Sequence, residues 1–211
     1  AASEQKHFPG LDKYLIMGEL GLDGSVREVQ GALPFADLAA GMGISGCIIP
    51  LRSALEATEC NDLSIFGVET LADVIRILEE QEDCSDLLVW NTRLYRKLSR
   101  NAQRVRKPSG QDVMDFSEII GQEGAKRGVE IAAAGGHNLI MVGPPGSGKS
   151  SLAKAMAGIL PPMTTEEAIV TSKIYSVAGM KSSQIGLIRT RPFRAPHYSA
   201  SLPAIIGGGA G

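Results

Sequence analysis

The stretch GPPGSGKS, residues 143 to 150, has the residue types and the spacing that bind a nucleoside triphosphate. It satisfies the pattern G-x-x-x-x-G-K-[ST], in which glycines let the backbone wrap closely around phosphate oxygens. We expect Lys149 to reach the β and γ phosphates and the Ser150 hydroxyl to take one position on Mg²⁺. The sequence therefore predicts ATP with Mg²⁺ as the cofactor and ADP as a further ligand.

In such a loop, successive backbone N–H groups and the beginning of the next helix face the anion. The alternative is a glycine-rich turn with an incidental lysine, and the flanking segments favour the phosphate site. Lys149 is the predicted catalytic residue, and Ser150 is the predicted metal ligand. The predicted nucleotide-binding residues of the loop are Gly143, Pro144, Pro145, Gly146, Ser147, Gly148, Lys149, Ser150 and Ser151.

The segments that flank this loop predict a strand before it and a helix after it. HNLIMV, residues 137 to 142, is expected to be a short buried strand. Residues 149 to 160 place apolar side chains at helical spacing, and Pro161-Pro162 ends that helix. Another helix is predicted before the strand, up to Ala133. This order is typical of the beginning of an α/β nucleotide-binding core.

Hydrolysis requires more than a phosphate loop, because an acidic residue at the end of a second strand must also hold Mg²⁺. After Ser150 the acidic residues are Glu166 and Glu167, in the polar stretch TTEEAIV. The final run, AIIGGGAG, is typical of a segment that leads into further structure. We therefore expect a fragment that binds nucleotide and does not complete a turnover alone.

The net charge of −2 conceals a division along the chain. Residues 1 to 86 hold sixteen acidic and five basic residues, a net charge of −11, whereas residues 87 to 211 carry +9. We predict a first module over residues 1 to 86, a basic linker over 87 to 115, and a nucleotide-binding core over 116 to 211.

The first module has the pattern of an α plus β domain. Two extended runs in residues 15 to 30 flank Asp23-Gly24, which is typical of a hairpin turn. A helix beginning near Pro34 and a buried strand, ISGCIIP, come next. A second strand over residues 63 to 68 precedes a helix that Thr70 is expected to cap.

The linker is predicted to be helical at first and then loose. Its bases follow one another without an acid, so contact with nucleic acid is one interpretation, with Trp90 and Tyr95 as stacking groups. The alternative is a solvated helix whose basic side chains face water or the acidic first module. This alternative is favoured, because runs of like charge more often have this role. The bases are Arg93, Arg96, Lys97, Arg100, Arg104, Arg106 and Lys107.

The chain shows no sign of a membrane segment, a leader or a metal site built from cysteine. No apolar run approaches the roughly 18 to 20 residues that a membrane helix needs, so a cytoplasmic protein is expected. Cys47, Cys60 and Cys84 have neither metal-ligand nor disulfide-framework spacing. We expect them to be reduced and structural.

The stretch FSEIIGQEGAKRGVEIAAAGGHNLIMVGPPGSGKSS, together with RPFRAPHYSAS, resembles the magnesium-chelatase-like AAA+ ATPases, and within them the bacterial competence-protein type. The resemblance implies an α/β fold, with a partial P-loop AAA+ core preceded by a smaller α+β Lon-protease-like (ribosomal S5 domain 2-like) module. It also implies that Ile119, Ile120 and Gly121 lie beside the adenine, and that the working form is a homo-oligomeric ring, a hexamer.

The first module is similar to the proteolytic domain of Lon, whose peptidases use a serine and a lysine. Pro34 stands where the resemblance places that lysine, and the segment for the serine would come before residue 1. A peptidase is therefore disfavoured, and a structural or DNA-facing module is expected.

The stretch RTRPFRAPHYS supplies a second group of candidate nucleic-acid contacts, namely Arg189, Arg191, Arg194 and His197, with aromatic residues between them. The alternative is an exposed loop whose bases pair with a neighbouring subunit. The predicted function of the intact form is ATP-driven branch migration of DNA. The rivals are an ATPase subunit of a magnesium chelatase and a nucleotide-binding ring scaffold without catalysis.

Overall fold

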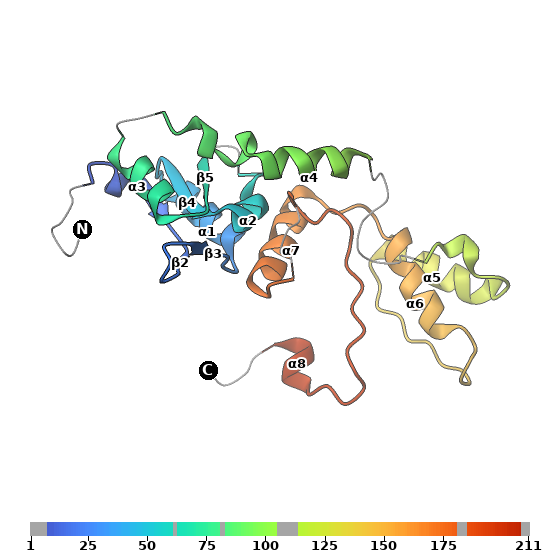
Figure 1. Cartoon of the computed structure of the whole chain (residues 1–211). Coiled ribbons are helices and arrows are strands. Elements are labelled where there is room, and N and C mark those ends of the chain that lie inside the picture. The colour runs from blue at the N-terminus through green and yellow to red at the C-terminus, as the bar shows by residue number, and fades with distance from the viewer. Residues whose placement is uncertain (1–7, 61–62, 81–82, 105–113, 181–184, 208–211) are drawn as a thin grey trace. The chain divides into compact units, whose positions relative to one another are not determined.

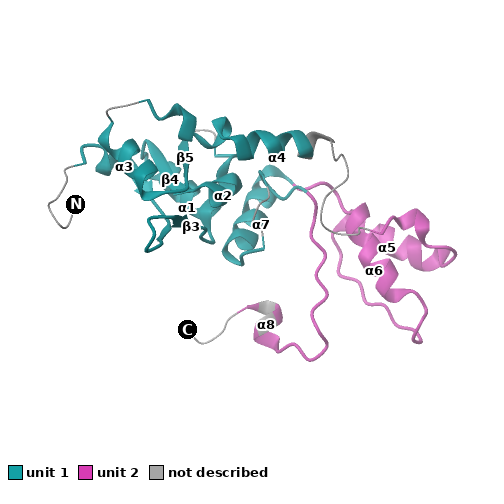
Figure 2. Ribbon diagram, viewed as in Figure 1, with its two compact units in different colours: residues 1–107, 164–189 teal, residues 108–163, 190–211 magenta. Residues whose placement is uncertain are grey.

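The computed structural model describes residues 8 to 60, 63 to 80, 83 to 104, 114 to 180 and 185 to 207. The chain forms two compact units, shown in Figure 2. Unit 1 comprises Ala1–Lys107 and Thr164–Arg189, and unit 2 comprises Pro108–Met163 and Thr190–Gly211. Unit 1 thus includes a segment that follows the predicted phosphate loop, and the module boundaries at residues 86 and 115 stay a prediction.

Unit 1 is built on a parallel sheet of three strands in the order β1-β4-β5. These strands are β1 (Tyr14–Ile16), β4 (Gly46–Pro50) and β5 (Ser64–Val68), and Ile48 lies between Ile16 and Phe66 in register. The central strand, β4, is buried throughout, as its run of apolar residues predicts for a strand covered on both faces. The two buried strands predicted from ISGCIIP and LSIFGV are confirmed.

A short antiparallel hairpin of β2 (Glu19–Leu20) and β3 (Val26–Arg27) precedes the central strand. Its turn contains Gly24 at φ 81°, a backbone conformation that glycine adopts without steric cost. The predicted hairpin is confirmed.

Side chains alternate between the two faces of the parallel sheet, and each face has its own hydrophobic cluster. On one face, Cys47, Ile49 and Ile65 pack with alanines of α1 (Ala32–Gly41). Short helical turns, α2 (Leu51–Ala54) and η2 (Leu55–Ala57), complete this cluster. The predicted helix at Pro34 is α1, so that expectation is confirmed.

The opposite face of the sheet is covered by α3 (Leu71–Glu79), which contributes Ile77 and Leu78. This helix begins with a capping box. The Asp73 backbone N–H donates to Thr70 Oγ1 at 3.3 Å, and the Thr70 backbone N–H donates to Asp73 Oδ2 at 2.9 Å. The predicted cap at Thr70 is confirmed.

The helix α4 (Arg93–Arg104), which the sequence assigned to a linker, packs on the α1 face of unit 1 (Figure 1). Leu94, Tyr95 and Leu98 lie against that cluster, as does Trp90 of the turn η4 (Val89–Asn91), which follows η3 (Ser85–Leu87). Trp90 and Tyr95 are therefore half-buried core side chains, which corrects their interpretation as stacking groups. The loose part predicted after α4 lies outside the described residues.

The helix α7 (Thr165–Val177) lies beside α1, although more than a hundred residues separate them in sequence (Figure 1). The Gly31 backbone N–H donates to the Ser176 carbonyl at 3.2 Å, and Lys173 Nζ lies 2.6 Å from Asp37 Oδ2. The buried Ser176 hydroxyl donates to the carboxyl group of Glu56, itself only 4% exposed. One buried hydrogen bond, one backbone hydrogen bond and one exposed ion pair thus hold α7 within unit 1.

Unit 2 contains η5 (Phe116–Glu118), α5 (Glu123–Gly135), α6 (Lys149–Ile159) and the short α8 (Leu202–Ile206). Helices α5 and α6 pack together. Their buried side chains are Val129, Ala132 and Ala133 from α5, with Leu152 and Ala155 from α6.

The strand predicted at residues 137 to 142 does not form, and the prediction is wrong for this structure. These residues are neither helix nor strand, and Ile140 and Val142 are 87% and 91% exposed. A strand needs a neighbour to receive its backbone hydrogen bonds. The described part of unit 2 contains no strand that could supply them.

The fold is therefore mixed α/β with a parallel sheet, which confirms the predicted class. Within the described residues, no helix has the length and apolar character to cross a membrane.

The docking of α7 can be tested by Ser176→Ala. Removing a hydrogen bond to the buried Glu56 carboxyl group should lower the free energy of unfolding by about 1 to 3 kcal/mol. The matched control is Ile174→Ala on the same helix, where the side chain is 62% exposed and the change should stay within about 0.5 kcal/mol. Urea unfolding of the full chain measures both. Equal stability of the two variants would contradict the observed packing.

A second prediction concerns Cys47, which is fully buried in β4. Burial raises the pKa of its thiol to about 12, with a smaller contribution from Cys60. Because the thiolate is the reactive form, iodoacetamide at pH 8 should leave Cys47 unmodified in the folded chain and label it in urea. Peptide mass spectrometry reads this out, and rapid labelling of Cys47 in the folded chain would disprove its burial.

Candidate nucleotide-binding loop

The loop between Gly143 and Lys149 owes its path to two glycines. Gly146 and Gly148 have φ angles of 80° and 83°, in the left-handed region that side-chain-bearing residues rarely adopt. A Cβ atom built on either glycine would meet no heavy atom within 4 Å. The glycines are therefore required for their backbone conformation, and the space beside them is open to a ligand.

The Lys149 ammonium group folds back over this loop. Its Nζ donates to the carbonyl oxygens of Gly143 at 2.9 Å and Pro144 at 2.7 Å, and to Ser147 Oγ at 3.2 Å. All three acceptors are uncharged, and no carboxylate pairs with this lysine within the described structure. Its positive charge is thus available to an anion at the loop.

The helix α6 begins at Lys149, directly after the left-handed Gly148. The first intrahelical bond runs from the Leu152 N–H to the Gly148 carbonyl at 3.0 Å, so the N–H groups of the first helical residues have no intrahelical acceptor. Buried Leu152 and Ala155 hold the helix against α5. Ser150 is exposed in the first turn, where its hydroxyl can reach a cation beside bound phosphates.

Gln122 connects the loop to the segment before α5, and the sequence analysis did not identify it. Its Nε2 donates to the Ser147 carbonyl at 3.4 Å, and its own backbone is left-handed at φ 58°. The sequence signal for this contact is a polar residue directly after a glycine. In the structure, that glycine, Gly121, has a φ angle of 72°. This contact brings the end of the segment 119 to 122 to the loop.

The predicted adenine-side residues differ in exposure. Ile119 is half-buried, whereas Ile120 is 95% exposed. The Ile120 side chain is therefore open to solvent. The assignment of Ile119, Ile120 and Gly121 to the adenine stays a prediction.

The two acidic residues after the loop serve the helix α7. Both lie in its first turn, where Glu167 Oε2 accepts from the Thr164 N–H at 2.9 Å and the Glu167 N–H donates to Thr164 Oγ1 at 3.2 Å. Across the described ranges, no group of three His, Cys, Asp or Glu side chains could hold a metal ion. The assignment of Ser150 as the ligand of Mg²⁺ stays a prediction.

The second group of predicted contacts is divided between the two units. Arg189, in unit 1, pairs with Glu59 at 3.0 Å, whereas Arg191, in unit 2, donates from Nε to the Pro161 carbonyl at 2.7 Å. Arg194 is exposed, and the His197 ring lies 4.3 Å from that of Tyr198. Arg189 and Arg191 thus already have acceptors within the chain, and their role toward DNA stays a prediction.

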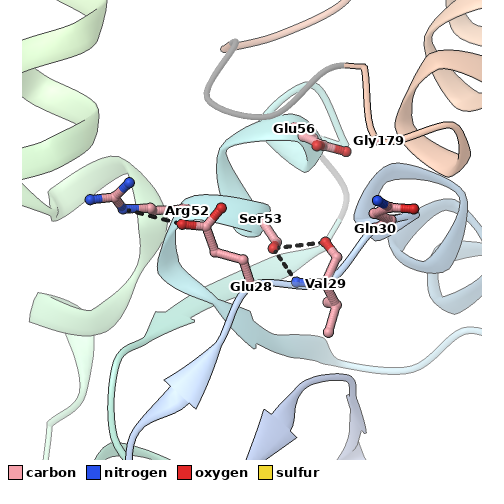
Figure 3. A pocket seen from close by; sticks show the side chains of 7 residues that line it. All are labelled: Glu28, Val29, Gln30, Arg52, Ser53, Glu56 and Gly179. Carbon is pink, nitrogen blue, oxygen red and sulfur yellow. Dashed lines mark hydrogen bonds and ion pairs between the residues drawn. The ribbon is translucent and has the colours of Figure 1, made fainter.

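A separate hollow of about 230 Å³ lies in unit 1, and Figure 3 shows its lining. Ser53 Oγ accepts from the Val29 N–H at 3.0 Å and donates to the Val29 carbonyl at 2.9 Å. No lysine is among the described lining residues. Its lining consists of Glu28, Val29, Gln30, Arg52, Ser53, Glu56 and Gly179.

Comparison with protein families gives two matches to the same kind of protein. The family described as "Magnesium chelatase, subunit ChlI" matches residues 115 to 211, which include the loop. The family described as "Subunit ChlI of Mg-chelatase" matches residues 1 to 53. Most of the chain is thus covered by descriptions of one subunit.

Individual relatives match over nearly the whole chain. The competence protein ComM of Haemophilus influenzae is 40% identical over 209 residues, 99% of this chain and 39% of its own length. The YifB protein of Salmonella typhimurium is 40% identical over 210 residues, 100% of this chain and 38% of its own length. The chain therefore spans about two fifths of the length of these relatives.

A more distant similarity supports the Lon-like character of the chain. An archaeal Lon protease of Halobacterium salinarum is 31% identical over 146 residues, 64% of this chain and 19% of its own length. Together with the two family matches and the identity to ComM and YifB, this places the chain in the magnesium-chelatase-like family, as a protein of the ComM and YifB type.

Proposed function

We propose that residues 143 to 151 bind ATP with Mg²⁺ and that the intact protein is an ATP-driven DNA motor that acts as a ring, a hexamer, in the cytoplasm. The observation that carries the nucleotide proposal is the Lys149 ammonium group, held by uncharged oxygens over a loop with two left-handed glycines. That arrangement presents positive charge and backbone N–H groups to an anion without a side chain in the way.

Lys149 would give up the carbonyl oxygens of Gly143 and Pro144 to hold the β and γ phosphates. The backbone N–H groups at the beginning of α6 would donate to phosphate oxygens, and Ser150 is the residue that would hold the cation. Bound Mg²⁺ would supply charge neutralisation between the phosphates. Gln122 holds the loop from the side through the Ser147 carbonyl.

The DNA part of the proposal draws on the family and on charge. The matched relative ComM is named a competence protein, and the proposed role of the intact form is branch migration of DNA. Residues 87 to 211 carry a net charge of +9, which favours a polyanionic partner.

A second candidate is an ATPase subunit of a magnesium chelatase, because both family matches carry that description. The 40% identity to the competence protein ComM favours the DNA motor instead. Measuring ATPase activity of a full-length ComM-type protein that contains this chain separates the two. Stimulation by branched DNA supports the motor, and stimulation by a porphyrin with no response to DNA supports the chelatase subunit.

Nucleotide binding is tested by Lys149→Ala. Loss of the ammonium group should weaken ATP affinity at least about tenfold, because a charge-assisted hydrogen bond contributes about 1.5 to 3 kcal/mol. The matched control is Lys154→Ala, an exposed lysine on the same helix, which should bind as the unmutated chain does.

Titration calorimetry with Mg²⁺ and ATP measures all three chains. Equal affinities of the Lys149 and Lys154 variants, or no binding by the folded unmutated chain, would remove the proposed site.

A further prediction is that the chain has no peptidase activity. Pro34 lies in the first turns of α1, and the Ser53 hydroxyl is engaged by the Val29 backbone. A fluorophosphonate probe should therefore label no serine, with trypsin as the positive control. Stoichiometric labelling at one serine, found by mass spectrometry, would show that a nucleophile is present.

A further inference from the structure

We propose that the outward face of α4 is the site at which this protein holds the phosphate backbone of a nucleic acid. This site, the α4 basic face, consists of Arg93, Arg96, Lys97 and Arg100. The inference rests on the proposed DNA function and names the surface that carries it.

The four bases share one side of the helix because their spacing is that of neighbouring turns. All four are exposed, and Leu94, Tyr95 and Leu98 occupy the opposite side, packed against the α1 cluster. The helix is therefore fixed in rotation, and the bases cannot turn inward. The fixed helix presents them as a ridge about 10 Å long from Arg93 to Arg100, at about 1.5 Å a residue.

The basic side chains of α4 differ from the other basic side chains of unit 1 in their ion pairs. None of the four side chains makes an ion pair or hydrogen bond with a described residue. Elsewhere in the described part of unit 1, each basic side chain pairs with a carboxylate: Lys13, Arg27, Arg52, Arg76, Lys173 and Arg189.

This contrast arises although residues 1 to 86 hold a surplus of eleven negative charges. If these basic side chains only neutralised the acidic residues, they would form ion pairs with them, as the other six described basic side chains of unit 1 do. The positive charge of the α4 basic face is instead available to a negatively charged partner. The acidic residues of the rest of the unit repel a polyanion. A bound polyanion is thereby confined to the α4 basic face.

The chemistry of the face favours nucleic acid among polyanions. Three of its four bases are arginines, whose planar guanidinium groups donate two parallel hydrogen bonds to a phosphate. A membrane-surface helix needs an apolar face directed at the lipid, whereas that face of α4 is packed in the core. Trp90 and Tyr95 are half-buried against the core and do not lie on this face. We therefore expect contact with the phosphate backbone of the nucleic acid, independent of its base sequence.

The face also differs from the loop that the sequence suggested for DNA. Arg189 pairs with Glu59, and Arg191 donates to the Pro161 carbonyl. Binding a phosphate there would first require these contacts to break. Among the residues that the structure describes, the α4 basic face has no such contact to lose.

The test compares two variants of the full chain by fluorescence anisotropy with a labelled single-stranded oligonucleotide over a range of salt concentrations. R93Q/R96Q/K97Q/R100Q removes the α4 basic face and keeps helix-forming residues. R189Q/R191Q/R194Q removes the bases of the loop. With four phosphates contacted, log affinity should fall with log salt at a slope of about −2.8 on a single strand.

We expect the α4 variant to lose most of the salt slope and to bind DNA at least about tenfold more weakly at low salt. The loop variant should keep the slope and the DNA affinity of the unmutated chain. Circular dichroism and ATP affinity should be unchanged in the α4 variant, which separates the loss of DNA contact from misfolding and from the nucleotide proposal.

Three outcomes would overturn the inference. The first is unchanged DNA binding by the α4 variant. The second is loss of binding in the loop variant alone. The third is binding of the α4 face to phosphatidylserine vesicles and not to DNA. In the first two outcomes, the proposed function still stands if the unmutated chain binds ATP and DNA. If the unmutated chain binds no DNA, both the α4 site and the proposed DNA function are wrong.

Discussion

A parallel sheet must be covered on both faces, and much of unit 1 follows from that requirement. The strands β1, β4 and β5 present apolar side chains on each face, so two sets of helices are needed. Helix α3 covers one face, and α1 with α4 covers the other. Because α4 is a covering helix, its apolar side chains point inward, and its basic side chains are left on the surface.

The two units are interleaved along the chain, because α7 follows α6 in sequence and yet belongs to unit 1. Helix α1 covers the sheet with small side chains, and α7 packs beside it through Gly31, Asp37 and the buried Glu56. The segment that follows the phosphate-loop helix is thereby part of unit 1. Helix α7, an element of the sheet-containing unit, thus begins a few residues after α6, which carries the proposed nucleotide site.

Local patterns were predictable from the sequence, and contacts between distant segments were not. The cap at Thr70, the hairpin turn at Gly24 and the glycines of the phosphate loop each depend on a few neighbouring residues. The packing of α7 on α1 depends on residues more than a hundred positions apart, and no periodicity reveals it. Gln122 escaped notice for the same reason, since its partner Ser147 is distant in sequence. The strand at 137 to 142 was predicted from its apolar residues, but a strand also needs a partner.

The central claim is that the backbone of the phosphate loop and the first turn of α6 hold the phosphates of ATP. Hydrogen exchange of the full chain, measured by mass spectrometry with and without Mg²⁺ and ATP, tests this directly, because bound amides exchange more slowly. The account predicts slower exchange in peptides covering residues 146 to 151, and no such change in peptides of α3, which belongs to unit 1. Unchanged exchange at residues 146 to 151 under saturating nucleotide would contradict it.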